Sequence, residues 1–573
     1  TLAFAAAKGV TPQFKWQKDG ADLPVDDRIS PDNLPKLVVK KSNTGAVTDS
    51  GIYTCVVTGP GPSPALTEQQ PGGQFDVRVF SDKPALALEE FPDAMVGAEF
   101  KYQIKVDNDP AKAPVSYAAK PLPSGLKLDT KTGRITGWPK VAVENLPVVI
   151  TVTNSFSKPP VSDTRLLTIR PVPERAVGVF AGWLPRHQEL NGFMGGRFDM
   201  TVTTAGAFSG RVTLGAVAYS FKGVLELDPA LVGAALPTAT VEIPRKGKPL
   251  PPPLILTFTI NTAAAPANTA NRLASASIGD GTLQNTIAFN AWRSIWAPKA
   301  LPPVTPAEFA PSKDNAYYTL ALLSPVPGAE DIPRGSGYAS FTVGADGRLT
   351  LAGRTADGQT ITGAQFLGPQ GQILVYQVLY KTKVKGSLLG NVSLTSAVPS
   401  ELTDNKIGGT LEWNCPPNDA KTNFTYREGF GNATPVVVTA VGGHYAAPVD
   451  PNLVLGLQTG ADNAVLTFEN GGVEDSETNP NLDGPDLQRP QQGWVSVTTG
   501  NKLLTPAAEI ANNGLVKISI VSKTGVFKGD FTLKDFPAGG IKPDVRKTPF
   551  IGVIVDEDDG ATAGRMWTGS GHF

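Results

Sequence analysis

Cysteine, histidine and excess charge are all scarce in this chain of 573 residues, and each scarcity excludes a class of protein. The two cysteines, Cys55 and Cys415, lie far apart, so neither a disulfide framework nor a cysteine-rich zinc site is expected. The three histidines, His187, His444 and His572, are equally scattered. The 51 basic and 52 acidic residues cancel without forming a basic stripe, which argues against a nucleic-acid partner.

Long apolar runs and familiar catalytic motifs are also missing. No stretch of about 18 apolar residues is present, so we expect no transmembrane helix. There is no Gly-x-Ser-x-Gly elbow, phosphate loop or dinucleotide fingerprint. Paired catalytic carboxylates would need two acids to converge in the fold, which a sequence does not reveal. We therefore expect a protein that is not an enzyme.

Glycine and proline, by contrast, are abundant, with 60 and 51 residues, while charged residues make up only 18% of the chain. Short apolar runs punctuated by Gly, Pro, Asn and Asp are typical of an all-β protein. The length exceeds what one hydrophobic core supports, so several domains are expected. Because the sequence starts at Thr1, with neither methionine nor a signal peptide, we expect a processed or partial chain.

The first 81 residues carry the marks of an immunoglobulin-like sandwich. Trp16 follows Phe14 in a strand-like run, and Tyr53 precedes Cys55 by two residues in a second run. These motifs resemble immunoglobulin domains of bacterial surface proteins, which implies a buried Trp16 and a corner tyrosine at Tyr53. Cys55 lacks the usual disulfide partner, so we expect a small buried side chain there. The chain begins where the second strand of such a domain belongs, which leaves the first strand missing.

The next segment, to about residue 172, contains Leu126 and Leu128 on one strand face and Ile135 beyond a turn at Gly133. The run from Leu122 to Pro139 resembles the cadherin-like "putative Ig" module of large bacterial surface proteins. That resemblance implies a second sandwich and says nothing about a ligand.

One phrase recurs in the rest of the chain: a strand, a turn glycine, an apolar residue, a second glycine and another strand. It runs over Met200–Leu214 and Ile518–Leu533, with a looser copy over Phe341–Gly353. Glycine inside a strand marks a bend or a close backbone approach, which suits aromatic-bearing strands that curve into a barrel. Alternatively, these glycines occupy hairpin turns. The last part of the chain also resembles glycine-punctuated β-regions that end large secreted bacterial proteins.

The sequence therefore predicts an all-β protein with two immunoglobulin-like sandwiches followed by a large antiparallel barrel-like β-domain built from repeated segments. The predicted divisions are 1–81 for the immunoglobulin-like domain, 82–172 for the putative-Ig domain, 173–310 and 311–450 for two β-rich repeat blocks, and 451–573 for a closing segment.

Two acidic loops are candidates for calcium, because each gathers carboxylates on a glycine-bearing loop. Their residues are Asp556, Asp558 and Asp559 in one loop, and Asp483 and Asp486 in the other. Neither loop has the spacing of an EF-hand, and acidic turns between strands are usually only solvated. No other cofactor is expected.

Tryptophans offer a second kind of site, since aromatic faces pack on sugar rings. Trp292 and Trp296 are four residues apart, and Trp183, Trp413, Trp494 and Trp567 lie elsewhere. In β-proteins most tryptophans are instead largely buried.

These features predict a non-enzymatic, extracellular structural or adhesion protein of a bacterial cell surface, filament or matrix. Its partners would be copies of itself or other surface proteins, with strand edges available for pairing between chains. The alternative is a carbohydrate-binding module of a polysaccharide-degrading system.

Overall fold

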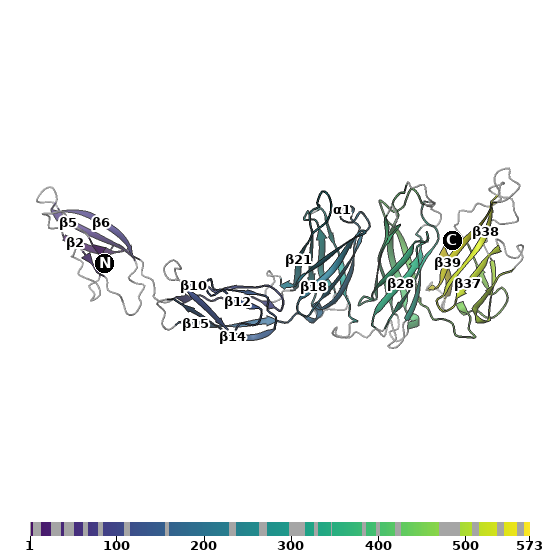
Figure 1. The fold of residues 1–573 in the computed structure, drawn as a ribbon, viewed down its shortest axis with the longest axis horizontal. Helices are drawn as coiled ribbons and strands as arrows, with labels where there is room; N and C mark the ends of the chain where they lie inside the picture. The colour runs from purple at the N-terminus through teal and green to yellow at the C-terminus, as the bar shows by residue number, and fades with distance from the viewer. Residues whose placement is uncertain are drawn as a thin grey trace. The chain divides into compact units, whose positions relative to one another are not determined.

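In the computed structural model the described chain is almost entirely β-structure, and it divides into two compact units, Thr1–Pro171 and Val172–Phe573 (Figure 1). The all-β fold class predicted from the sequence is confirmed. The structure describes residues 2–3, 13–23, 36–38, 51–60, 67–77, 84–107, 115–154, 160–227, 236–262, 272–282, 284–296, 316–325, 331–344, 346–380, 385–396, 402–418, 426–468, 493–506, 515–535, 544–557 and 566–572.

The first module of unit 1 is a small antiparallel assembly with an immunoglobulin-like core. Trp16 lies directly opposite Cys55 in the sheet, and both side chains are fully buried together with Tyr53, as the sequence predicts. Cys55 is a free thiol, and burial raises its pKa. The strands of the main sheet, in order, are β3 (Ala21–Asp22), β2 (Gln13–Lys18), β5 (Gly51–Pro60) and β6 (Thr67–Val77), and β1 (Leu2–Ala3) pairs with β4 (Lys36–Leu37).

The second module packs two sheets around a core that includes the fully buried side chains of Ile135, Ile150 and Leu167. Ile135 pairs with Leu128 across the hairpin that the sequence predicts. One sheet contains β11 (Ser116–Lys120), β14 (Val143–Thr153), β15 (Val161–Arg170) and β8 (Ala94–Met95). The other contains β12 (Leu126–Leu128), β13 (Arg134–Gly137) and β9 (Phe100–Gln103), and β7 (Ala85–Leu86) pairs with β10 (Val106–Asp107).

Unit 2 begins with η2 (Glu174–Ala176) and a strand meander that we call the first barrel. Two strands bend from one sheet into the other at single buried residues, Leu225 and Phe289. Each bent strand belongs to both sheets. If it is counted as one strand, every described strand of the meander is hydrogen-bonded to a neighbour on both sides, so the two sheets together close into a barrel. One sheet contains β19 (Val217–Val224), β18 (Ala207–Leu214), β17 (Gly196–Val202), β16 (Gly178–Leu184) and β25 (Asn290–Arg293). The other contains β20 (Glu226–Leu227), β21 (Pro237–Ile243), β22 (Leu254–Ile260), β23 (Leu273–Gly279) and β24 (Thr286–Ala288).

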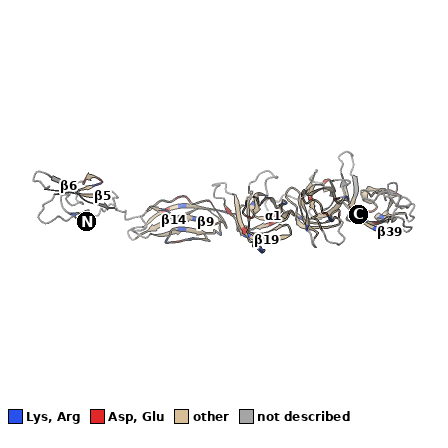
Figure 2. Cartoon of the chain, turned by 90° about the horizontal axis from the view of Figure 1, so that it is seen from above, with Lys and Arg blue, Asp and Glu red and all other residues tan. Residues whose placement is uncertain are grey.

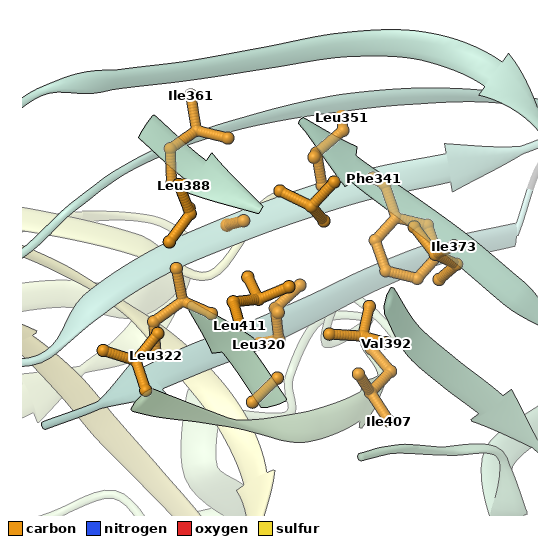
Figure 3. Packing of buried hydrophobic residues seen from close by; sticks show 14 of the residues in the cluster. Leu320, Leu322, Phe341, Leu351, Ile361, Ile373, Leu388, Val392, Ile407 and Leu411 are labelled. Atoms are coloured by element: carbon orange, nitrogen blue, oxygen red, sulfur yellow. The ribbon is translucent and has the colours of Figure 1, made fainter. Parts of the chain in front are cut away.

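The second barrel is one sheet of eight strands, in the order β29-β28-β27-β26-β33-β32-β31-β30. Alternate side chains point inward, and leucine, isoleucine, valine and phenylalanine from all sides meet at its centre (Figure 3). The barrel-like fold is thus confirmed, and it occurs twice. The strands are β26 (Ala316–Leu323), β27 (Gly337–Val343), β28 (Arg348–Arg354), β29 (Thr360–Phe366), β30 (Gln372–Leu379), β31 (Gly386–Thr395), β32 (Lys406–Asn414) and β33 (Val436–His444), with η4 (Leu402–Asp404) before β32.

Glutamine side chains bridge the seam between β29 and β30, where the second barrel has no backbone ladder. The Gln365 amide donates to the Leu374 carbonyl, and its Oε1 accepts from the Leu374 N–H at 3.0 Å. Across the same seam, the Thr362 N–H donates to Gln377 Oε1 at 3.0 Å. Side-chain amides thus replace the missing strand pairing and satisfy edge groups that would otherwise be unpaired.

We expect Gln365→Ala to loosen this seam, because it leaves both backbone groups of Leu374 without their partner. The expected loss of unfolding free energy is about 1–3 kcal/mol. Hydrogen exchange of the Leu374 amide measures it directly and should accelerate. The exposed Thr350→Ala on β28 is the control, and equal exchange in both variants would contradict a closing role for Gln365.

The remainder of unit 2, which we call the closing segment, has two described sheets. One contains β34 (Ala464–Leu466), β35 (Gly493–Thr498) and β36 (Lys502–Leu504). The other contains β37 (Lys517–Val521), β38 (Val526–Asp535), β39 (Asp544–Glu557) and β40 (Met566–His572). The short helix η5 (Val454–Gly456) precedes the first sheet, and η6 (Thr499–Asn501) connects β35 to β36.

The first glycine of the recurring phrase occupies a hairpin turn in all three copies. Gly206, Gly347 and Gly525 have φ angles of +76°, +70° and +67°. This left-handed region favours glycine, because a Cβ there meets the backbone. The turn interpretation therefore holds for this position.

The second glycine lies inside a strand and is covered by an aromatic ring from the neighbouring strand. In the first copy Phe208 lies opposite Gly223, and Gly210 lies opposite Phe221. A Cβ on Gly210 would come within 2.4 Å of the Phe221 ring, and one on Gly223 within 2.6 Å of the Phe208 ring. Each ring therefore occupies space that the opposite glycine leaves free, and at Gly210 the Asp199 carbonyl oxygen is as close to the added Cβ as the ring is. We call this reciprocal arrangement a Phe-Gly clasp.

The closing segment repeats the clasp between β38 and β39. Phe527 lies opposite Gly552, and Gly529 lies opposite Phe550. In the looser middle copy the second glycine, Gly353, lies opposite Ala339, and a Cβ there would meet the Tyr338 carbonyl oxygen at 2.2 Å instead of a ring. The interpretation of strand glycines beside aromatics therefore holds for the two close copies.

Candidate functional site

The predicted calcium residues are not brought together by any described contact. Asp556 lies in β39 opposite Trp567 of β40, with its side chain not described. Asp558, Asp559, Asp483 and Asp486 lie outside the described residues. Among the residues that are described, no group of three or more His, Cys, Asp or Glu side chains could hold a metal ion. Calcium at the two loops stays a prediction.

The paired tryptophans do not form an exposed platform. Trp292 is only 9% exposed, and Trp296 packs against the core of the second barrel. The Trp296 indole N–H donates to the Leu367 carbonyl. The Trp296 ring also lies so close to Gly347 that a Cβ added there would be 2.1 Å from the ring atom Cγ. The sugar-stacking prediction is therefore wrong for this pair, because the tail of the first barrel uses these rings to dock on the second.

A buried arginine joins the two barrels. Arg186 follows β16, and its side chain is 4% exposed. It forms an ion pair with Glu412 Oε2 at 2.9 Å and donates to the Glu412 carbonyl at 2.8 Å. It also donates to Ser387 Oγ and to Asn414 Oδ1, each at 2.8 Å. Burial lowers the pKa of Arg186, and the Glu412 carboxylate opposes that shift.

The side chain of one asparagine holds the conformation of the loop that carries Arg186. Asn191, in the short helix α1 (Gln188–Asn191), is 4% exposed. Its Oδ1 accepts from the His187 N–H at 2.9 Å and from the Gly195 N–H at 3.1 Å. Its amide donates to the Pro185 carbonyl at 2.8 Å. These bonds fix the chain on both sides of Arg186, so its five donors meet acceptors that are already in place. No sequence motif marks this loop.

A second joint fastens the closing segment to the outside of the second barrel. Thr319 on β26 is 0% exposed, and its hydroxyl donates to the Ile554 carbonyl at 2.7 Å. The Tyr317 hydroxyl donates to the Thr524 carbonyl at 3.1 Å, and the Tyr445 hydroxyl donates to the Ser522 carbonyl at 2.6 Å. Burial raises the pKa of Tyr445 to about 12, which keeps it a neutral donor.

A cleft of about 710 Å³ lies beside this second joint. One wall is the turn between β28 and β29 together with Tyr426, and the other is the face of β37–β39. The charged residues of its lining are Arg354, Asp357, Lys517, Lys528 and Asp530. His572 also lines the cleft, where burial lowers its pKa and favours the neutral ring at pH 7.

The Asp357 carboxylate accepts hydrogen bonds from two hydroxyl groups, one in the β28–β29 turn and one on a buried tyrosine. One of its carboxylate oxygens accepts from the Thr355 hydroxyl, and the other accepts from the Tyr380 hydroxyl at 2.6 Å. Nearby Cys415 is a free, buried thiol whose pKa burial raises to about 12, so it is unreactive. The two carboxylates of the described lining therefore differ, since hydroxyl groups engage Asp357 and no hydrogen bond of the described residues engages Asp530.

Charge elsewhere is dispersed. Figure 2 shows basic and acidic residues interspersed along the described ribbons, with no stripe of one sign. No helix of the part that is described has the length and apolar character to cross a membrane.

These features define an all-β protein with an immunoglobulin-like module and two barrels. Residues 89–171 match the family model described as "Putative Ig domain", which confirms the predicted nature of the second module. No curated protein matches the chain.

Several solved structures show weak similarity. The "putative alpha-galactosidase/melibiase" of Bacteroides fragilis is 26% identical, with a TM-score of 0.13, and the match covers 15% of this chain and 17% of that protein. Domains 3–5 of Drosophila OTK are 13% identical, with a TM-score of 0.16, and coverage of 38% and 85%. The human desmocollin-1 ectodomain is 9% identical, with a TM-score of 0.22, and coverage of 71% and 90%. At these TM-scores the likeness supports no functional conclusion.

Proposed function

We propose that this protein is a non-enzymatic, extracellular structural or adhesion protein of a bacterial surface, filament or matrix, in which unit 2 acts as a rigid spacer. The observation that carries the proposal is the Arg186 joint. A buried cation with a full set of acceptors permits little relative movement, since any shift would leave a charge and several polar groups unpaired. The contacts of Thr319, Tyr317 and Tyr445 give the closing segment the same kind of attachment.

Rigid β-modules in series hold their loops at fixed separations, where they can meet a partner. The proposed partners are further copies of the chain or other surface proteins, engaged through exposed strand edges. Intact source cells labelled with a membrane-impermeant reagent should yield labelled protein, whereas exclusive labelling after lysis would contradict the extracellular placement.

Spin labels test the spacer directly. Val217→Cys on the first barrel and Val437→Cys on the second are suitable sites, because the native side chains are 53% and 43% exposed. Both native cysteines are buried and should remain unlabelled. Pulsed dipolar spectroscopy should give one narrow distance distribution. The width of this distribution should equal that of a control pair within the first barrel, Val217→Cys with Val179→Cys. A distribution between the barrels that is much broader than the control would contradict a rigid joint.

A further inference from the structure

We propose that the cleft between the β28–β29 turn and the face of β37–β39 binds an acidic polysaccharide, through a uronate unit of its chain. This ligand goes beyond the spacer role, which does not depend on it. The volume of about 710 Å³ lies within the range of sites for small ligands, roughly 300–1,000 Å³.

Unpaired cations give the cleft its preference for an anion. Lys517 and Lys528 lie on neighbouring strands, are both exposed, and form no ion pair with any other described residue. Arg354 faces them from the opposite wall, with one guanidinium N–H donating to the Gly358 carbonyl at 3.1 Å. The lining holds three cations, Arg354, Lys517 and Lys528, against the two carboxylates of Asp357 and Asp530, so one positive charge is left in excess. A carboxylate can therefore accept from them.

The rest of the lining suits a sugar ring. Pro549 and Ile551 provide an apolar strip, and Tyr426 adds a half-buried ring held edge-on to Phe430 at 5.6 Å. Rings and apolar strips of this kind pack on the faces of pyranose units. Asp530 supplies free carboxylate oxygens that can accept sugar hydroxyls.

The same wall disfavours an acidic peptide. An extended peptide binds by adding to an open strand edge, where main-chain groups are free. The lining crosses β37, β38 and β39, so the cleft lies over the face of this sheet and not along the outer edge of β37, which is unpaired in the described sheet. Between its neighbours β38 is paired along both sides, with Lys517 opposite Asp530 and Lys528 opposite Ile551. The cleft therefore recognises its ligand mainly by side chains, which fits the carboxylate and hydroxyls of a uronate.

Titration calorimetry of the full chain with tetragalacturonate tests the proposal. We expect binding that weakens as salt is raised, because exposed cations are screened. The double variant Lys517→Gln/Lys528→Gln should bind at least about tenfold more weakly, as expected for loss of two charge-assisted hydrogen bonds. Lys502→Gln, an exposed lysine on β36 outside the cleft, should bind like the parent.

Two further ligands make the test specific. Fully methyl-esterified tetragalacturonate, which lacks the charges, should bind weakly, and so should hexaglutamate, which keeps charge without sugar rings. Absence of tetragalacturonate binding, equal affinity for either comparison ligand, or an unchanged affinity of the double variant would each overturn the proposal. Since both lysines are exposed, an unchanged unfolding temperature of the double variant would show that lost binding is not lost folding. None of these outcomes bears on the rigidity measured by spin labels.

Discussion

Replacing Arg186 by methionine is expected to destabilise the joint between the two barrels by about 3–5 kcal/mol. Methionine keeps part of the side-chain volume but donates no hydrogen bond. The change therefore removes the Arg186 donor from Ser387 Oγ, Asn414 Oδ1 and the Glu412 carbonyl. Asn414 Oδ1 keeps the N–H and the hydroxyl of Ser387 as donors, so the loss falls mainly on the other two acceptors. Buried acceptors without a donor incur their full desolvation penalty, which is why the expected effect is large.

Hydrogen exchange across β31 and β32 measures this loss where it occurs. Exchange in Arg186→Met should accelerate at the Ser387 amide, which is bonded to Asn414 Oδ1 at 3.0 Å. The spin-label distribution between the barrels should broaden in the same variant. Arg348→Met is the matched control, because that arginine is 87% exposed and pairs with a solvated Asp346. Its effect should stay within about 0.5 kcal/mol. Equal effects of the two substitutions would show that the joint does not depend on Arg186.

Local patterns explain why the immunoglobulin-like core and the strand glycines could be predicted. Trp16, Tyr53 and Cys55 match the spacing of immunoglobulin domains, and that resemblance implied the core position of Trp16, which the structure buries with the other two. The Phe-x-Gly steps are likewise a local pattern, because a glycine in a strand leaves room for an aromatic ring on the neighbouring strand. A second Phe-x-Gly step, Phe221 to Gly223, follows on the next strand and is the sequence signal for the pairing of the two steps.

The joints and the cleft could not be predicted, because they depend on contacts between residues far apart in the sequence, from 77 positions for Tyr445 and Ser522 to 235 for Thr319 and Ile554. Arg186 is an ordinary arginine in sequence, and its partners lie on β31 and β32, about two hundred residues later. For Trp292 and Trp296, spacing alone does not distinguish an exposed platform from a docking surface. The structure decides this through Leu367 and Gly347 of the second barrel.

The second large effect concerns the Phe-Gly clasp of the first barrel. Phe208→Ala should reduce the unfolding free energy by about 3–5 kcal/mol, because the ring is 3% exposed and packs edge-on to Phe258 at 5.1 Å. Gly223→Ala should cost about 1–3 kcal/mol, because the added Cβ would lie 2.6 Å from the Phe208 ring and has no closer neighbour.

Combining the two substitutions separates a clasp from ordinary packing. Once the ring is removed, the new methyl group enters the space it leaves, so Gly223→Ala should cost little or nothing in the Phe208→Ala background. Denaturant unfolding of the four proteins of this cycle should therefore show a coupling of about 1–2 kcal/mol. Gly408→Ala is the control, since a Cβ at that exposed strand position meets nothing within 4 Å. It should be neutral or slightly stabilising, as less chain entropy is lost on folding. Additive costs at Phe208 and Gly223 would mean that the glycine is required by its backbone conformation and not by the ring, and the recurring phrase would then lose its physical explanation.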